Sequence, residues 1–173
     1  ENIDAYLTAG ALALGTRDIG KAWRLFVKAR TVRPDNVTVL EGIVEVMTRR
    51  GHHGLIARAA RRWLCADPRA QVAGSALASA WTSIARVAEA TKVARRTLLM
   101  NPLDGKLQGT LARSELKSGA HERAIESARR YAMINPMSSF ALLTLSEASV
   151  KRENLSLCET SSIWLRVVAS DRG

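Results

Sequence analysis

Cysteine is scarce in this sequence, and long apolar stretches are missing. Cys65 and Cys158 are too few for a disulfide framework and lack the C-x-x-C spacing of metal and redox sites. No apolar run approaches the roughly 20 residues that a membrane-spanning helix requires. We therefore expect two unpaired thiols, no transmembrane helix and a cytoplasmic location.

Motifs for catalysis are missing as well. No glycine-rich segment has the spacing of a phosphate-binding loop, and no serine or cysteine lies in a recognisable nucleophile motif. His52 and His53 lie between two glycines, and because no third ligand is in register, a solvent-facing turn is the preferred interpretation over a metal site. The sequence predicts that the chain is not an enzyme and binds no cofactor or metal.

Proline is rare, but its placement is informative. The four prolines, Pro34, Pro68, Pro102 and Pro136, are equally spaced, so that each is separated from the next by the same interval. Proline disfavours helical backbone in the residue before it, so each one indicates the end of a helix. We expect one repeat domain over residues 1–173, with helix pairs at 3–36, 37–70, 71–104, 105–138 and 139–172.

Small and apolar residues recur within this period. The twentieth position of the five repeats is occupied by Ala22, Ile56, Ala90, Ala124 and Cys158. Small side chains at this position, as in four of the five repeats, let neighbouring helices approach closely. One helix pair cannot bury its apolar face alone, so stacked copies are expected to form a continuous core with an extended surface for partners.

The pattern resembles the tetratricopeptide repeat family, whose unit of about 34 residues has small residues at positions 8 and 20 and proline at position 32. The first repeat matches at Tyr6, Gly10, Ala22, Phe26 and Pro34, while the fifth departs from the pattern and is expected to be a degenerate cap. The resemblance implies a right-handed all-α solenoid that serves as an adaptor or scaffold for a protein or peptide. By analogy alone, a chaperone-like component of a bacterial secretion system is an alternative.

The resemblance also places a concave groove on the first helix of each repeat. The candidate groove residues are Asp4, Leu7, Glu41, Glu45, Arg49, Ser75, Ser79, Lys106, Arg113, Lys117, Phe140, Leu143, Glu147 and Lys151. This groove is acidic in the early repeats and basic in the late ones. We expect an extended peptide to bind in one direction, with its basic segment on repeats one and two and its acidic segment on repeats four and five. For Glu45 and Arg49, a plain i,i+4 surface pair is the alternative.

The net charge of +10 needs its own explanation. Arginine pairs recur at positions 25 and 26 of the second to fourth repeats, and they are Arg61, Arg62, Arg95, Arg96, Arg129 and Arg130. Such a basic band is typical of a solvated outer face, which is the preferred interpretation. The alternative is a surface that binds nucleic acid or an acidic partner.

Overall fold

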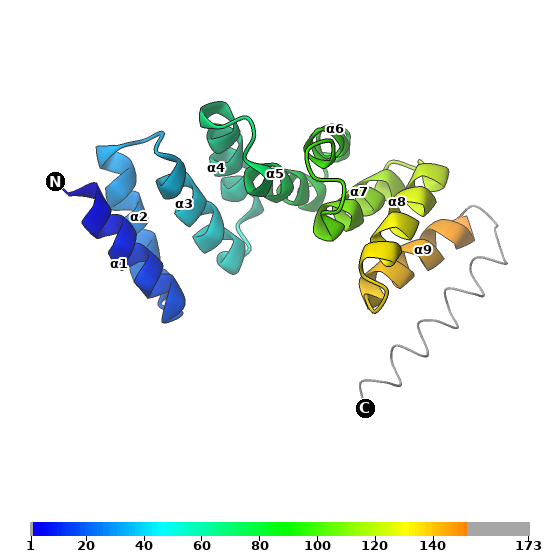
Figure 1. The fold of residues 1–173 in the computed structure, drawn as a ribbon, viewed down its shortest axis with the longest axis horizontal. Coiled ribbons are helices and arrows are strands. Elements are labelled where there is room, and N and C mark those ends of the chain that lie inside the picture. The colour runs from blue at the N-terminus through cyan, green and yellow to red at the C-terminus, as the bar shows by residue number, and fades with distance from the viewer. Residues whose placement is uncertain (1, 152–173) are drawn as a thin grey trace. The chain divides into compact units, whose positions relative to one another are not determined.

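The computed structural model describes residues 2–151, and this part of the chain is helical and contains no strand (Figure 1). Its helices are α1 (Ile3–Gly15), α2 (Ile19–Val32), α3 (Val37–Arg50), α4 (His53–Ala66), α5 (Gln71–Ser83), α6 (Val87–Leu98), α7 (Gly105–Lys117), α8 (His121–Ile134) and α9 (Ser139–Lys151). The second helix expected for the fifth repeat lies outside the described residues. The predicted all-α solenoid of helix pairs is confirmed.

The chain divides between Ile84 and Ala85 into two compact units. Unit 1 contains α1 to α5, and unit 2 contains α6 to α9. The division falls inside the third repeat, between its first and second helix. The single repeat domain expected over residues 1–173 stays a prediction.

Side-chain caps begin the first helices of two repeats. The carboxamide oxygen of Asn36 accepts a hydrogen bond from the backbone N–H of Val39 at 3.1 Å, and the carboxylate of Asp104 accepts one from the N–H of Leu107 at 3.0 Å. A cap satisfies a backbone donor that has no partner inside the helix, and it stabilises the helix by about 1 kcal/mol. Both helices therefore start where the spacing of the prolines places a new repeat.

The turn between the two helices of a repeat has left-handed backbone at one constant position. Arg17, Gly51, Ala85 and Gly119 occupy this position in the first four repeats and have φ angles of 60°, 72°, 63° and 78°. Glycine adopts this conformation freely, whereas a residue with a side chain loses about 1–2 kcal/mol there. The backbone therefore repeats more regularly than the sequence, which has glycine at only two of these four positions.

Alanine occupies the places where helices meet. Ala22, Ala90, Ala94, Ala124 and Ala128 on the second helices are 0% exposed. A larger side chain at such a position would push the neighbouring helix away, because interiors are packed without spare room. The small positions read from the sequence are thus contact points between helices.

The first repeat has a different core, because Phe26 takes the place of an alanine. Its ring is 3% exposed and lies against Gly10 of α1 and Gly42 of α3. A β-carbon at Gly10 would lie 2.9 Å from Cζ of the ring, and one at Gly42 would overlap the ring. Phe26 therefore fits between these two helices only because both have glycine at the contact.

Replacing Arg17 with glycine should stabilise the protein. The variant Arg17→Gly removes the cost of a side chain in left-handed backbone. Glycine also makes the unfolded chain more flexible, which offsets part of this gain, so the free energy of unfolding should rise by about 0.5–1 kcal/mol. Urea unfolding followed by circular dichroism measures it. The matched variant Gly51→Ala has open space around the added β-carbon and should lose about 1 kcal/mol. A loss of stability in Arg17→Gly would contradict this account of the turn.

Candidate functional site

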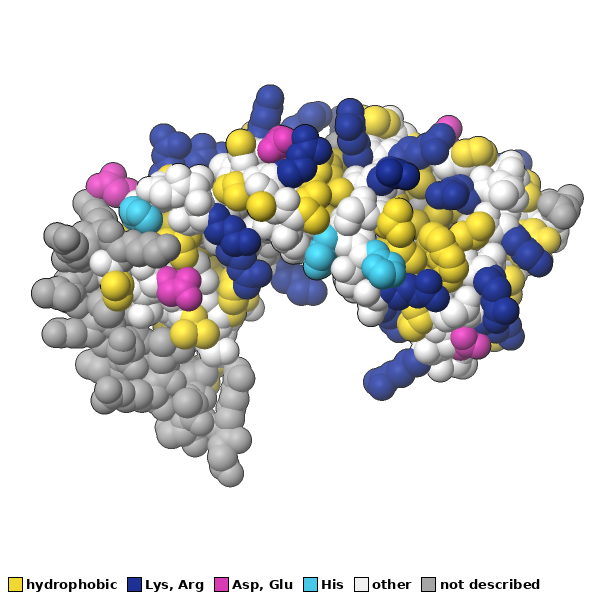
Figure 2. All heavy atoms as spheres, turned by 180° about the vertical axis from the view of Figure 1, so that it is seen from behind, with side chains coloured by type: hydrophobic (Ala, Val, Ile, Leu, Met, Phe, Trp, Pro, Cys, Tyr) yellow, Lys and Arg dark blue, Asp and Glu magenta, His cyan; other side chains and the backbone are white. Residues whose placement is uncertain are grey.

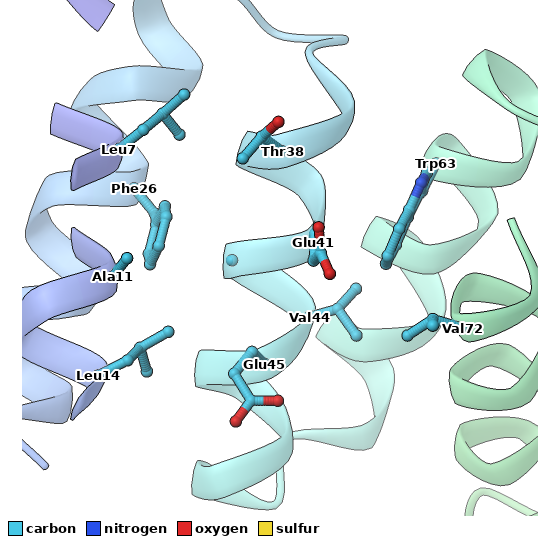
Figure 3. A pocket seen from close by; sticks show the side chains of 11 residues that line it. Leu7, Ala11, Leu14, Phe26, Thr38, Glu41, Val44, Glu45, Trp63 and Val72 are labelled. Carbon is cyan, nitrogen blue, oxygen red and sulfur yellow. The ribbon is translucent and has the colours of Figure 1, made fainter. Parts of the chain in front are cut away.

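Unit 1 has a hollow of about 330 Å³ on the faces of its first helices (Figure 3). We call it the acidic hollow, and its lining residues are Leu7, Ala11, Leu14, Phe26, Thr38, Glu41, Gly42, Val44, Glu45, Trp63 and Val72. Most of them belong to α1 and α3. The structure thus brings three of the candidate groove residues, Leu7, Glu41 and Glu45, to one place.

Apolar walls and two carboxylates make up this surface. Figure 3 shows Leu7 and Leu14 extending from α1 toward α3, which carries Glu41 and Glu45 one turn apart. Both glutamates are exposed. A side chain with an aliphatic stem and a positive end complements such a surface, because the stem contacts the leucines and the charge reaches a carboxylate.

Arg49 is engaged within unit 1. Its Nε lies 2.8 Å from Oε1 of Glu45, and its Nη1 donates a hydrogen bond to the carbonyl oxygen of Leu14 at 2.9 Å. Arg49 thus links α3 to α1 and balances the charge of Glu45, as in the i,i+4 interpretation. Within residues 2–151 no ion pair involves Glu41. Of the two carboxylates in the acidic hollow, Glu41 is therefore the one whose negative charge can pair with a ligand.

Trp63 of α4 lines the acidic hollow, which its sequence position did not indicate. The side chain is 4% exposed, and its Nε1 is buried without a hydrogen-bond partner within the described residues. A buried indole N–H usually has an acceptor. Trp63 is thus a core residue that the packing of the helices also places in the lining of the hollow.

The other candidate groove residues of unit 1 lie outside this hollow. Asp4 is exposed in the first turn of α1, where its negative charge interacts favourably with the helix dipole. On α5, Ser75 is half-buried and Ser79 is exposed. The structure therefore gathers only part of the early groove that the sequence predicts.

The first-helix face of unit 2 is basic and partly aromatic. Lys106, Arg113 and Lys117 are exposed on α7. The guanidinium carbon of Arg113 lies 4.3 Å from the centroid of the Phe140 ring on α9, which is a cation–π distance. The Phe140 ring in turn packs against Tyr131 of α8, with centroids 5.8 Å apart. Two candidate groove residues, Arg113 and Phe140, are thus in direct contact.

Helix α9 carries the remaining candidate groove residues. Leu143 is 50% exposed, and Glu147 is exposed as well. Lys151 ends α9, and its side chain lies outside the described part of the chain. An exposed leucine on the helix that also carries Phe140 gives this face both charge and apolar surface.

The arginines of the basic band are only partly available to a partner. Arg61, Arg96 and Arg129 are exposed, and Lys and Arg side chains are spread over the face seen in Figure 2. The other member of each pair has an acidic partner: Arg62 with Asp35, Arg95 with Glu115, and Arg130 with Glu126. Ion pairs on the surface contribute little to stability, but they reduce the charge that a nucleic acid would meet.

A buried carboxylate joins three helices of unit 2. Glu115 of α7 is 2% exposed, its Oε1 accepts a hydrogen bond from Nη2 of Arg95 on α6 at 2.7 Å, and its Oε2 accepts one from Oγ of Ser127 on α8 at 2.7 Å. A buried charge is costly unless it is paired and hydrogen-bonded, and Glu115 is both. The sequence did not reveal this network, because Glu115 there looks like any exposed helical glutamate.

No protein-family model matches the sequence, and no curated protein matches it. Solved structures do match. A crystal structure of MamA aligns with a TM-score of 0.84 at 19% identity, covering 97% of this chain and 90% of that chain. MamA from Desulfovibrio magneticus RS-1 aligns with a TM-score of 0.86 at 14% identity, covering 97% of this chain and 93% of that chain. YrrB, described as a TPR protein with an unusual peptide-binding site, aligns with a TM-score of 0.84 at 13% identity. This alignment covers 96% of this chain and 86% of that chain. The chain has the tetratricopeptide-repeat (TPR) fold.

Within residues 2–151 of this TPR fold, no three His, Cys, Asp or Glu side chains lie together so that they could hold a metal ion. None of the described helices is both long and apolar enough to cross a membrane. The thiol of Cys65 is free and exposed, and Cys158 lies outside the described residues. That the chain is no enzyme, needs no cofactor and is cytoplasmic stays a prediction.

Removing the buried carboxylate should destabilise unit 2 of the TPR fold. The variant Glu115→Ala leaves Arg95 and Ser127 without their acceptor and opens a cavity, so the free energy of unfolding should fall by about 2–3 kcal/mol. Urea unfolding measures the loss. The matched variant Glu126→Ala breaks an exposed ion pair and should lose about 0.5 kcal/mol or less. Equal losses in the two variants would show that the buried network adds nothing.

Proposed function

We propose that the chain is a protein-interaction module that binds an extended peptide along the first-helix faces of its repeats. The acidic hollow carries this proposal, since helices of successive repeats supply it with matching apolar and acidic side chains. Binding sites for ligands are typically concave and mostly apolar, with a few polar groups that fix orientation. The description of YrrB as a TPR protein with a peptide-binding site supports the same class of function for this chain.

In unit 1 the ligand is a lysine or arginine side chain of the partner, together with the apolar residue next to it. The aliphatic stem packs on Leu7 and Leu14, and the positive end reaches Glu41. The hydroxyl of Thr38 lines the same hollow and can hydrogen-bond to the peptide backbone. The negative charge of Glu41 selects a basic residue, and the leucines add affinity because they bury the apolar surface of its stem.

In unit 2 the first-helix face has the opposite charge. Lys106, Arg113 and Lys117 attract an acidic segment of the partner, and Leu143 offers apolar surface on α9. The guanidinium of Arg113 is held over the ring of Phe140, so it loses less freedom when it binds a carboxylate. A partner with a basic segment for unit 1 and an acidic segment for unit 2 satisfies both faces.

Reversing the charge of Glu41 should weaken the binding of a basic peptide. The probe is a fluorescein-labelled peptide of repeated Lys-Leu-Ser triplets, and its fluorescence anisotropy is followed as the full chain is added. The variant Glu41→Lys replaces attraction by repulsion, so the Kd should rise about tenfold, which corresponds to about 1.4 kcal/mol.

The control for this experiment is Glu122→Lys on α8, an exposed acid of unit 2 whose replacement changes the net charge equally. We expect its Kd for the basic probe to stay within about twofold of the unchanged chain. If both variants weaken binding equally, the probe responds to net charge alone, and the acidic hollow is not its site.

A further inference from the structure

Unit 2 has a second hollow, formed by α6, α7 and α8, with a volume of about 540 Å³. We call it the arginine hollow, since Arg95, Arg123 and Arg130 are among its lining residues. The candidate groove residues of α7 and α9 do not line it. Its walls come mainly from second helices, so it is separate from the face to which we assign peptide binding.

The floor of the arginine hollow is held in place before any ligand arrives. Glu115 and Ser127 line the hollow. Glu115 accepts hydrogen bonds from both Ser127 and Arg95, and these two bonds join α6, α7 and α8. These bonds fix the position of the Arg95 guanidinium at the edge of the hollow. A site whose groups are already ordered loses less entropy on binding.

Gln108 supplies an unused hydrogen-bond acceptor in the wall. The side chain is 4% exposed, and its Nε2 donates to the carbonyl oxygen of Pro102 at 3.3 Å. Its Oε1 is buried and has no hydrogen-bond partner within the described residues. A buried acceptor without a partner is unfavourable, so an N–H group of a ligand that reached this amide would satisfy it.

Leucine side chains give the hollow an apolar part. Leu99 lines it and is 84% exposed, while Leu98 and Leu111 are buried beside it. A leucine with so much exposed surface at the edge of a hollow gains free energy when an apolar ligand group covers it.

Cationic groups are available at the same edge. Arg123 is exposed, and no ion pair within residues 2–151 involves it. The side chains of Arg95 and Arg130 are in ion pairs but remain 47% and 61% exposed. A guanidinium has five N–H donors, so each of these arginines can bind a further carboxylate.

We propose that the arginine hollow binds a short acidic peptide segment that carries an apolar side chain. The carboxylates of the segment pair with Arg123 and with the exposed edges of Arg95 and Arg130, and a backbone N–H bonds to Gln108. The apolar side chain packs on Leu99. Nucleic acid fits this hollow less well, since its lining residues include no aromatic ring for base stacking.

The test uses a labelled peptide of repeated Glu-Leu-Ser triplets and the full chain, with binding followed by fluorescence anisotropy. The variant Arg123→Glu should raise the Kd about tenfold. Its control, Arg129→Glu, makes the same charge change on the same helix at an exposed residue that does not line the hollow, and it should stay within about twofold. Likewise Leu99→Ser should weaken binding about fivefold. Its control is Leu103→Ser, because Leu103 is 75% exposed but does not line the hollow, and this variant should bind the probe unchanged.

A third variant gives an effect in the opposite direction. Glu126→Gln releases Arg130 from its ion pair, so the acidic probe should bind about threefold more tightly. A gain of affinity would not arise if Arg130 and Glu126 only supported the fold. Circular dichroism checks that the helix content of each variant is unchanged.

Two results would overturn the proposal. Equal losses in Arg123→Glu and Arg129→Glu, with single-stranded DNA displacing the probe, would mean that a general basic field binds any polyanion. A loss confined to the double variant Arg113→Glu/Lys117→Glu would place the acidic peptide on the first-helix face of unit 2. The second result would exclude the arginine hollow as the binding site and would support the proposed function. The proposed function is also tested independently, by binding of the basic probe to the Glu41 variant.

Discussion

Close approach between helices at a few small residues is the constraint on which the rest of the structure depends. A pair of helices buries its apolar face only by stacking on the next pair, and Ala94 and Ala128 show how little room the contact leaves. Because the same contact recurs from repeat to repeat, the first helices within each unit turn equivalent faces to solvent. Side chains on those faces can then differ freely without loss of the fold. The charged residues of the two hollows, such as Glu41 and Arg123, lie at exposed positions outside these small contact residues.

The sequence predicts the periodic part of the structure well. Equally spaced prolines and small residues at fixed positions are consequences of helix packing, so they identify the helix pairs and the start of α3 and α7 correctly. The resemblance to tetratricopeptide repeats, rather than the spacing alone, places Leu7, Glu41 and Glu45 on one face, and in the structure all three line the acidic hollow. The left-handed turns are less visible, since Arg17 and Ala85 stand where glycine would have indicated them.

The parts that the sequence did not predict depend on how far a side chain reaches across helices. Arg49 bonds to the backbone of Leu14, 35 residues earlier, and Glu115 meets Arg95 and Ser127 on two other helices. Neither contact repeats with the period, so no spacing along the chain indicates it. Charged residues are also read as solvent-exposed by default, which hid the buried carboxylate and made half of the arginine band look free.

The fit of Phe26 between two glycines has a consequence for how this array of repeats could have grown. Solenoids lengthen by tandem duplication, and a repeat with alanine at its twenty-fourth position can be copied without disturbing its neighbour. A duplicate of the first repeat would instead set Thr8 where Gly42 now lies, and the branched side chain would collide with the ring. The first repeat is therefore tied to the one that follows it, and an insertion between them requires a compensating change at the ring or at the glycine. Growth of the array is easier from its later repeats, where the contact is made by alanine.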